Sequence, residues 1–504
     1  IMRALTVALV AASFAATGCG PPGSHIHVAD PDGFVILEPT APTWIEELAG
    51  DSQPAEGTWP HVLLISLDTL RADHLGAWGY DRPTSPFLDE LTRFGIRFDR
   101  VFSQSSKTAP SHMTVFTGAY PSEHGAHFEY RKLGAKPVVF PARSDLPTLA
   151  EVMRRAGYRT AAWTGGGQVT RRAGFARGFE RYSENCRYID PGKMQTIRTW
   201  FRRHSSEPCF IFLHTYQIHD PYLPPPPYNT VFISPDYRGW VVGDEKSLAG
   251  IQATGDYPSP QAAFWKKRGW MPDPSIIGPD DLRRLVDQYD GGIRYTDDVL
   301  HGFFEGLHSD GLLDNTIVVL FSDHGEEFLE HGDVLHKMLY RETLHVPLIF
   351  FGPAHLPTDV VVEQQVALMD LTPTLLELIG VDAPWDSNAR SLLPLIDAPD
   401  SGEDRLVYSE EPWTHWKAYH RSYRTGSLML YDRDHADIEL YNVAADPEEL
   451  DDLAEIEPGL ASELLREMLS FLGNRFPASS DPTEPASELS DAEIEALRKL
   501  GYVQ

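Results

Sequence analysis

Two segments that lie far apart in the chain share one pattern, an apolar run that ends in an acid. Residues 61–67 are followed by Asp68, and residues 317–322 are followed by Asp323 and His324. Apolar runs of this length are typical of parallel strands that are covered on both faces. Because ligands bind at the carboxyl ends of such strands, the pattern predicts that Asp68, Asp323 and His324 meet at one site.

A third segment, residues 108–118, begins with the hydroxyl residue Thr108 and continues as a predicted helix. Pro110 suits the first position of a helix, because that position needs no N–H donor. The N-terminus of a helix favours bound anions. The sequence therefore predicts that Thr108 stands at an anion-binding helix end beside the acids.

Two carboxylates and one imidazole suit a divalent cation. We expect Asp68, Asp323 and His324 to bind one ion, with Thr108 as a fourth contact when its hydroxyl is deprotonated. A metal-bound alkoxide would overcome the weak acidity of threonine at neutral pH. For Asp68 alone the alternative is a helix N-cap after the strand. Further Asp and His ligands for a second ion do not stand out in the sequence.

Residues 67–76, 108–118 and 322–325 resemble segments of the sulfatase family of the alkaline-phosphatase superfamily. Four further segments are similar to that family and follow its order, namely 219–222, 294–298, 346–350 and 439–448. The resemblance implies an α/β fold, with an αβα sandwich around a mostly parallel mixed sheet and a smaller C-terminal α+β subdomain. It also implies Ca²⁺ as the ion, with Mn²⁺ and Zn²⁺ as alternatives.

The resemblance assigns the nucleophile to Thr108, and the chain departs from the family there. Sulfatases convert a Cys or Ser at this position to formylglycine, and an Arg stands where this chain has His112. Threonine carries its hydroxyl on a secondary carbon, so it cannot form that aldehyde. Gly165 and Gly167 stand where arylsulfatases have a sulfate-binding Lys and His. Threonine nucleophiles occur in relatives that act on phosphodiesters and phosphonate esters, so we expect phosphorus esters to be preferred over sulfate monoesters.

Three further residues are candidates for catalysis. The resemblance implies that His219 contacts the substrate, where it could protonate the leaving oxygen; the alternative is a buried structural histidine. It also implies an anion-binding lysine or histidine near Tyr340, where the spacing fits His336 slightly better and leaves Lys337 as a charge clamp. Structural roles are expected for His124, His331, Asp297 and Asp298.

A chain of 504 residues exceeds the usual size of one core, so we expect a large domain and a smaller one. The predicted catalytic domain spans residues 59–400 and the C-terminal subdomain 401–475. Residues 20–58 read as a tether, and residues 476–504 as an acidic linker with a terminal helix. The segment 228–279 is rich in Pro, Gly and aromatic residues, and is either a lid or a variable surface excursion.

The first residues predict export. Arg3 precedes a short apolar run, and the small residues before Cys19 resemble a bacterial lipoprotein box. We expect residues 1–19 to be a lipoprotein signal peptide with Cys19 as the lipidated mature N-terminus; an ordinary secretory signal is the alternative. The protein would then be lipid-anchored in the bacterial cell envelope, facing the periplasm or the surface. Cys186 and Cys209 remain, either as a disulfide or as buried thiols.

These observations predict a metal-dependent hydrolase of an anionic ester, with Thr108 as the metal-bound nucleophile. One alternative is an enzyme that transfers the phosphoryl group to an envelope acceptor. Another is an inactive binding lipoprotein with this fold, against which the presence of all four metal-site residues argues. The net charge of −30 argues against nucleic acid as a partner.

If Cys19 carries the lipid, Cys19→Ser will move the protein from the membrane fraction to the soluble periplasmic fraction. Mass spectrometry of the wild-type N-terminus tests the same prediction directly. A wild-type protein that is already soluble and carries no lipid would contradict it.

Overall fold

The computed structural model describes residues 28–29, 35–36, 44–46, 48, 59–129, 138–252, 278–383, 388–400, 402–411, 420–433 and 437–475. Its contacts divide the chain into two units, residues 1–39 and 40–504. In the first unit, β1 (Val28–Ala29) pairs antiparallel with β2 (Val35–Ile36). The predictions for the signal peptide, Cys19 and the terminal helix lie outside the described residues, and the predicted domain boundaries stay predictions.

The second unit is built on a sheet of eight strands, in the order β14-β4-β13-β10-β3-β9-β7-β8. In this order the strands are β14 (Val360–Ala367), β4 (Ile96–Phe102), β13 (His345–Phe351), β10 (Thr316–Phe321), β3 (His61–Leu67), β9 (Cys209–Thr215), β7 (Arg159–Trp163) and β8 (Arg181–Ser183). Only β13 is antiparallel to its neighbours. The predicted mostly parallel mixed sheet is confirmed.

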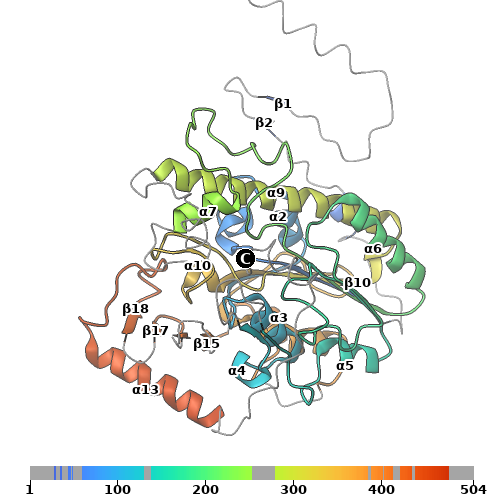
Figure 1. The fold of residues 1–504 in the computed structure, drawn as a ribbon. Coiled ribbons are helices and arrows are strands. Elements are labelled where there is room, and N and C mark those ends of the chain that lie inside the picture. The colour runs from blue at the N-terminus through green and yellow to red at the C-terminus, as the bar shows by residue number, and fades with distance from the viewer. Residues whose placement is uncertain are drawn as a thin grey trace, which may run out of the picture. The chain divides into compact units, whose positions relative to one another are not determined.

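Alternate residues of each central strand enter two different cores. Val62 and Leu64 of β3 face one core, whereas Leu63 and Ile65 face the other. The first core is closed by α3 (Thr108–Thr117), α5 (Leu149–Arg155), α11 (Leu371–Leu378) and α12 (Leu393–Asp397). The second is closed by α2 (Pro86–Arg93), α6 (Pro191–His204) and α9 (Pro279–Ser309). Figure 1 shows α9, α2 and α6 on one side of the sheet and α3 and α5 on the other, which confirms the αβα sandwich.

The predicted structural role of Asp297 and Asp298 is confirmed. The Asp297 carboxylate on α9 accepts the N–H groups of Phe87 and Leu88 at 3.0 and 2.9 Å, at the start of α2. Asp298 accepts the Tyr228 hydroxyl at 2.6 Å. Asp297 therefore satisfies orphan donors of a helix N-terminus.

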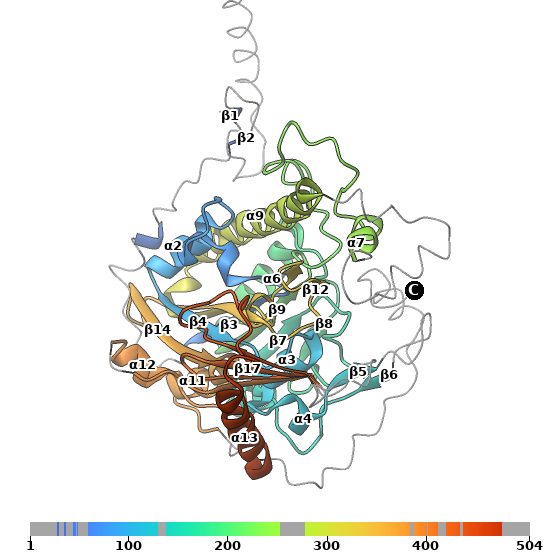
Figure 2. The same ribbon diagram turned by 90° about the vertical axis from the view of Figure 1, so that its left-hand side faces the viewer.

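A second sheet forms the smaller C-terminal subdomain. It contains β15 (Val407–Glu411), β16 (His420–Arg424), β17 (Met429–Arg433) and β18 (Asp437–Tyr441), all antiparallel. Figure 2 shows the helix α13 (Pro458–Arg475) beside this sheet. Leu464 and Met468 of the helix belong to the same hydrophobic core as the sheet. The predicted α+β subdomain is confirmed.

The C-terminal sheet holds the loop that leads to Thr108. The Glu410 N–H donates to the Gln104 carbonyl at 2.9 Å. The Glu411 carboxylate accepts the Ser106 N–H at 3.0 Å and also the Ser105 hydroxyl. The edge strand β15 therefore supports the approach to the predicted nucleophile.

The remaining described elements are short. The helix α7 (Glu245–Gln252) lies inside the segment 228–279, and its apolar residues Leu248 and Ile251 pack into the second core. Cys186 and Cys209 are buried free thiols. None of the described helices combines the length and the apolar character needed to cross a membrane. The short elements are η1 (Ala72–His74), η2 (Gly76–Trp78), α4 (Pro121–His124), β5 (His127–Glu129), β6 (Val138–Phe140), α7 (Glu245–Gln252), η4 (Leu313–Asn315), β11 (Glu327–Phe328), β12 (Val334–Leu335), α10 (Arg341–Leu344) and η5 (Leu368–Asp370).

Candidate metal centre and nucleophile

The two predicted acids are neighbours because β3 and β10 are parallel partners. Ser66 pairs in register with Phe321, and each acid, Asp68 or Asp323, lies two residues beyond this pair. Asp68, Asp323 and His324 are fully buried, and one ligand atom from each lies within 4.8 Å of the others. The structure therefore brings together the three residues that the sequence predicted to meet.

The open acceptor atoms of this group fit a cation. Among the described residues, Oδ1 of Asp68 and both carboxylate oxygens of Asp323 have no hydrogen-bond partner. Nδ1 of His324 donates to the Gly325 carbonyl at 3.0 Å, so the lone pair of this imidazole is on Nε2. Nε2 lies 3.3 Å from Asp323 Oδ2 and 3.9 Å from Asp68 Oδ1. Two carboxylates and a neutral imidazole facing one point are a suitable ligand set for a divalent ion.

The pKa shifts of the three residues also indicate a site for a cation. Burial, and then repulsion by the Asp323 carboxylate, raises the pKa of Asp68 well above its usual value. Burial also opposes ionisation of Asp323, but the His324 and His112 rings outweigh it and lower the pKa of that carboxyl. Burial lowers the pKa of His324 to about 4, so its ring is neutral at pH 7 as metal binding requires. A cation would remove the repulsion that opposes ionisation of Asp68.

Thr108 is the first residue of α3 and lies against the same group. Its hydroxyl oxygen is 3.3 Å from Nε2 of His324. The helix begins at Thr108, so Pro110 is its third residue and not its first, as the sequence had suggested. The Ala109 N–H in this first turn donates to Oε1 of Gln168 at 3.3 Å. The helix N-terminus and the threonine hydroxyl thus face one buried site.

Of the three other catalytic candidates, His336 lies next to His324, and His219 lies next to His336. The His336 ring is 4.5 Å from the His324 ring and 5.1 Å from the His219 ring, measured between centroids. Burial, and then the neighbouring His324, lowers the pKa of His336 well below its usual value, so this ring is neutral at pH 7. Lys337 instead extends toward Asp333, with 2.5 Å between Nζ and Oδ1.

The weaker histidine candidates have structural partners. His124 accepts the Ala126 N–H at 3.0 Å on Nδ1, and its Nε2 lies 3.1 Å from the Pro110 carbonyl. His331 contacts the Glu342 carboxylate at 2.7 Å and the Glu449 carbonyl at 2.8 Å.

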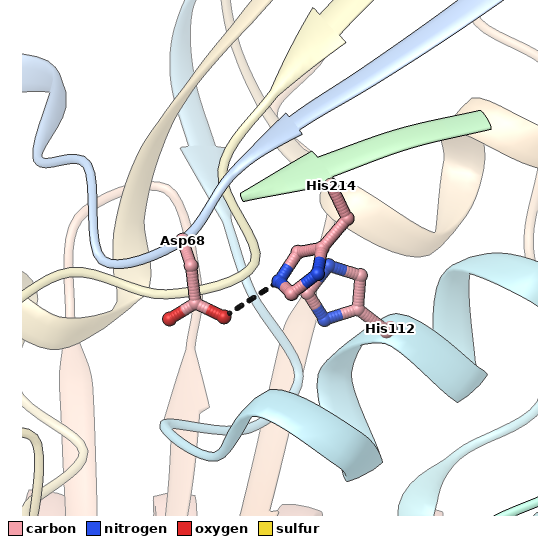
Figure 3. Close-up of side chains that lie close together, drawn as sticks. All are labelled: Asp68, His112 and His214. Carbon is pink, nitrogen blue, oxygen red and sulfur yellow. Dashed lines mark hydrogen bonds and ion pairs between the residues drawn. The ribbon is translucent and has the colours of Figure 1, made fainter. Parts of the chain in front are cut away.

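The sequence did not single out Lys107, or predict His112 and His214 as part of the metal group. Lys107 precedes Thr108, and its ammonium donates to the His336 carbonyl. His112 lies four residues after Thr108, one helical turn along α3. His214 lies near the end of β9 and contacts Asp68 Oδ2 at 3.0 Å, as Figure 3 shows. The available signal for His214 was a polar residue near the end of a buried apolar strand, the same signal that identified Asp68.

The loop after β7 has no room for a side chain at its first glycine. A Cβ at Gly165 would lie 2.4 Å from the ring of Tyr216. Gly166 and Gly167 have φ angles of +70° and +60°, which side chains rarely adopt. The backbone here is thus unsuited to the lysine and histidine that arylsulfatases carry at positions 165 and 167.

Comparisons with known proteins identify one family over most of the chain. The sequence profile described as "Sulfatase" matches residues 60–381, and the profile "N-sulphoglucosamine sulphohydrolase, C-terminal" matches residues 329–470. The chain is 24% identical to an arylsulfatase K of Xenopus laevis over 442 residues, which cover 77% of each protein. It is 23% identical to an arylsulfatase of Clostridium perfringens, over 82% of this chain and 92% of the relative.

Solved structures share the fold. One is a protein in complex with its substrate D-glucosamine-2-N,6-O-disulfate, with a TM-score of 0.65 and 19% identity over 84% of this chain and 100% of the other. Another is the phosphonate monoester hydrolase of Agrobacterium radiobacter, with a TM-score of 0.62 and 20% identity over 82% of this chain and 96% of the other.

Asp323→Ala is expected to abolish metal binding while the chain stays folded, because it removes two open carboxylate oxygens without emptying a large apolar volume. Elemental analysis and thermal unfolding measure the two effects. The matched control is Asp287→Ala, which removes another buried acid. Asp287 lies on α9, and its Oδ1 pairs with Nη1 of Arg82 at 2.8 Å. Unchanged metal content in the Asp323 variant would remove this residue from the site.

Proposed function

Because the chain belongs to the sulfatase family, a family of ester hydrolases, we propose that it is a metal-dependent hydrolase that uses Thr108 as its nucleophile and prefers phosphorus esters. The observation that carries the proposal is the position of Thr108. Its hydroxyl oxygen lies 3.3 Å from His324 Nε2, at the N-terminus of α3 and beside two buried carboxylates.

Asp68, Asp323 and His324 would hold the divalent ion. When bound there, such an ion supplies positive charge that favours loss of the Thr108 proton and stabilises negative charge on the substrate. The start of α3 offers further stabilisation of an anion, because a helix N-terminus carries partial positive charge. The family resemblance favours Ca²⁺, with Mn²⁺ and Zn²⁺ as alternatives.

The reaction of Thr108 has two steps. In the first, Thr108 releases its hydroxyl proton to solvent water, Oγ1 bonds to phosphorus, and the bond from phosphorus to the leaving oxygen breaks. His219 is our candidate for the proton donor to that oxygen, and it is reprotonated by the attacking water of the second step. In the second, that water bonds to phosphorus as hydroxide, the bond to Oγ1 breaks, and Oγ1 regains a proton from solvent.

His336 and Lys337 divide the roles that the sequence left open. His336 is buried beside His324 and neutral, so it can exchange hydrogen bonds with substrate but carries no charge. Lys337 is paired with Asp333, so its charge is already balanced. We therefore propose His336 as the substrate contact and Lys337 as a support for the surrounding loop.

Two features support phosphorus over sulfur. Threonine cannot become formylglycine, the group through which sulfatases release sulfate. The glycine loop at residues 165–167 lacks the sulfate-binding side chains of arylsulfatases, and its conformation disfavours them. The similarity in fold to phosphonate monoester hydrolases is compatible with this preference.

The proposed preference predicts the outcome of a substrate panel. Purified protein loaded with Ca²⁺, Mn²⁺ or Zn²⁺ is expected to hydrolyse bis-nitrophenyl phosphate or a nitrophenyl phosphonate faster than nitrophenyl sulfate. Release of nitrophenolate is measured with each metal, and Asp323→Ala serves as the control for contaminating activity. An enzyme that prefers nitrophenyl sulfate over every phosphorus ester would overturn the assignment.

Thr108→Ala is expected to lower the rate by several powers of ten, the scale of loss when a covalent nucleophile is removed. Mass spectrometry of a quenched wild-type reaction should find the added group on Thr108. The matched control is Thr114→Ala, which removes another buried threonine hydroxyl on α3, one that contacts His124 at 3.1 Å. Near-normal turnover of Thr108→Ala would exclude the covalent mechanism.

A further inference from the structure

A second group of possible metal ligands shares Asp68 with the first. It consists of Asp68, His112 and His214, whose ligand atoms lie within 4.8 Å of one another. All three residues are fully buried. The rings of His112 on α3 and His214 on β9 meet edge to face, with 4.8 Å between their centroids. Figure 3 shows both rings on the same side of the Asp68 carboxylate. Such a group either binds a second ion or holds the acid in place, and the hydrogen bonds of its rings distinguish these roles.

His214 is a donor to Asp68 and not a ligand. Its Nδ1 accepts the Gly165 N–H at 3.1 Å, so this nitrogen carries no proton. A neutral imidazole has one N–H, which therefore lies on Nε2 and donates to Asp68 Oδ2 at 3.0 Å. A metal on Nε2 would require a ring that has lost both protons. Without His214 the second group has too few ligands for a metal site of its own.

His112 connects the nucleophile residue to the other acid. Its Nδ1 donates to the Thr108 carbonyl at 2.8 Å, because a carbonyl can only accept. The same nitrogen lies 3.2 Å from Asp323 Oδ2. Nε2 lies 2.8 Å from the Ser66 hydroxyl, which is able to donate to it. Both nitrogens of His112 thus have partners inside the protein.

We propose that His214 and His112 are positioning residues for a centre that holds one ion. His214 binds one oxygen of Asp68 and directs the other, Oδ1, toward the ion. His112 fixes the first turn of α3 against Asp323, at the position where the resemblance places an arginine in sulfatases. The inference rests on the metal ion of the proposed function. Hydrogen bonds from residues that do not touch the ion orient the residues that bind it, and their loss weakens metal binding about ten- to one-hundred-fold.

The test is a metal titration of chelator-treated protein with Ca²⁺, Mn²⁺ and Zn²⁺, each alone. The wild type is expected to bind one ion per chain. His214→Ala should still bind one ion but about ten- to one-hundred-fold more weakly. His214→Gln should recover most of the affinity, because its amide can donate to Asp68. His112→Asn, whose amide can still donate to the Thr108 carbonyl, should likewise exceed His112→Ala in metal affinity.

His61 provides the matched control. It is a buried histidine at the opposite end of β3, and its Nδ1 also accepts a backbone N–H, that of Cys209, at 3.1 Å. His61→Ala is expected to lower thermal stability and leave metal affinity unchanged. Binding of two ions by the wild type, one of them lost in His214→Ala, would overturn the inference, as would unchanged affinity in His214→Ala. A wild-type chain that binds no ion would overturn the metal centre itself.

Discussion

The parallel pairing of β3 with β10 is the constraint on which the site depends. These strands lie far apart in the chain, and the register that pairs Ser66 with Phe321 sets the two acids at the same height on adjacent strands. A shift by one residue would turn one acid to the opposite face of the sheet. Alternate apolar residues of both strands enter two different buried cores. Such a shift would therefore also turn each apolar side chain of the shifted strand toward the wrong core. Core packing therefore fixes the positions of the two acids of the proposed metal site.

Bringing two carboxylates into this core has a cost that the surrounding histidines only partly offset. Asp68 receives one hydrogen bond from His214, and among the described residues Asp323 has ring contacts to His112 and His324. Buried charges without full compensation destabilise the folded state. A bound cation would supply the missing compensation, so metal binding and stability of the fold are expected to be linked. The same physical argument that identifies the site also explains why its ion would matter for folding.

The sequence predicted the residues whose positions follow from strand and helix patterns. It missed the contacts that depend on the direction of individual side chains. Asp68, Asp323 and Thr108 follow from apolar runs and a helix start, signals carried by neighbouring residues. Spacing favoured His336 over Lys337 only slightly, because adjacent residues point in different directions and the folded loop decides which one faces His324. The strands β16 and β18 were missed because arginine, aspartate and glutamate interrupt their short runs.

Several departures from the sulfatase pattern belong to one hydrogen-bonded network. Thr108 receives a hydrogen bond on its carbonyl from His112, which replaces an arginine. Gly165, which replaces a lysine, gives its N–H to His214 and thereby fixes the proton that His214 donates to Asp68. A lysine side chain at position 165 would displace Tyr216 and disturb this donor. The His112 ring and the Gly165 backbone thus contact residues of the proposed metal site, at positions where the resemblance places an arginine and a lysine.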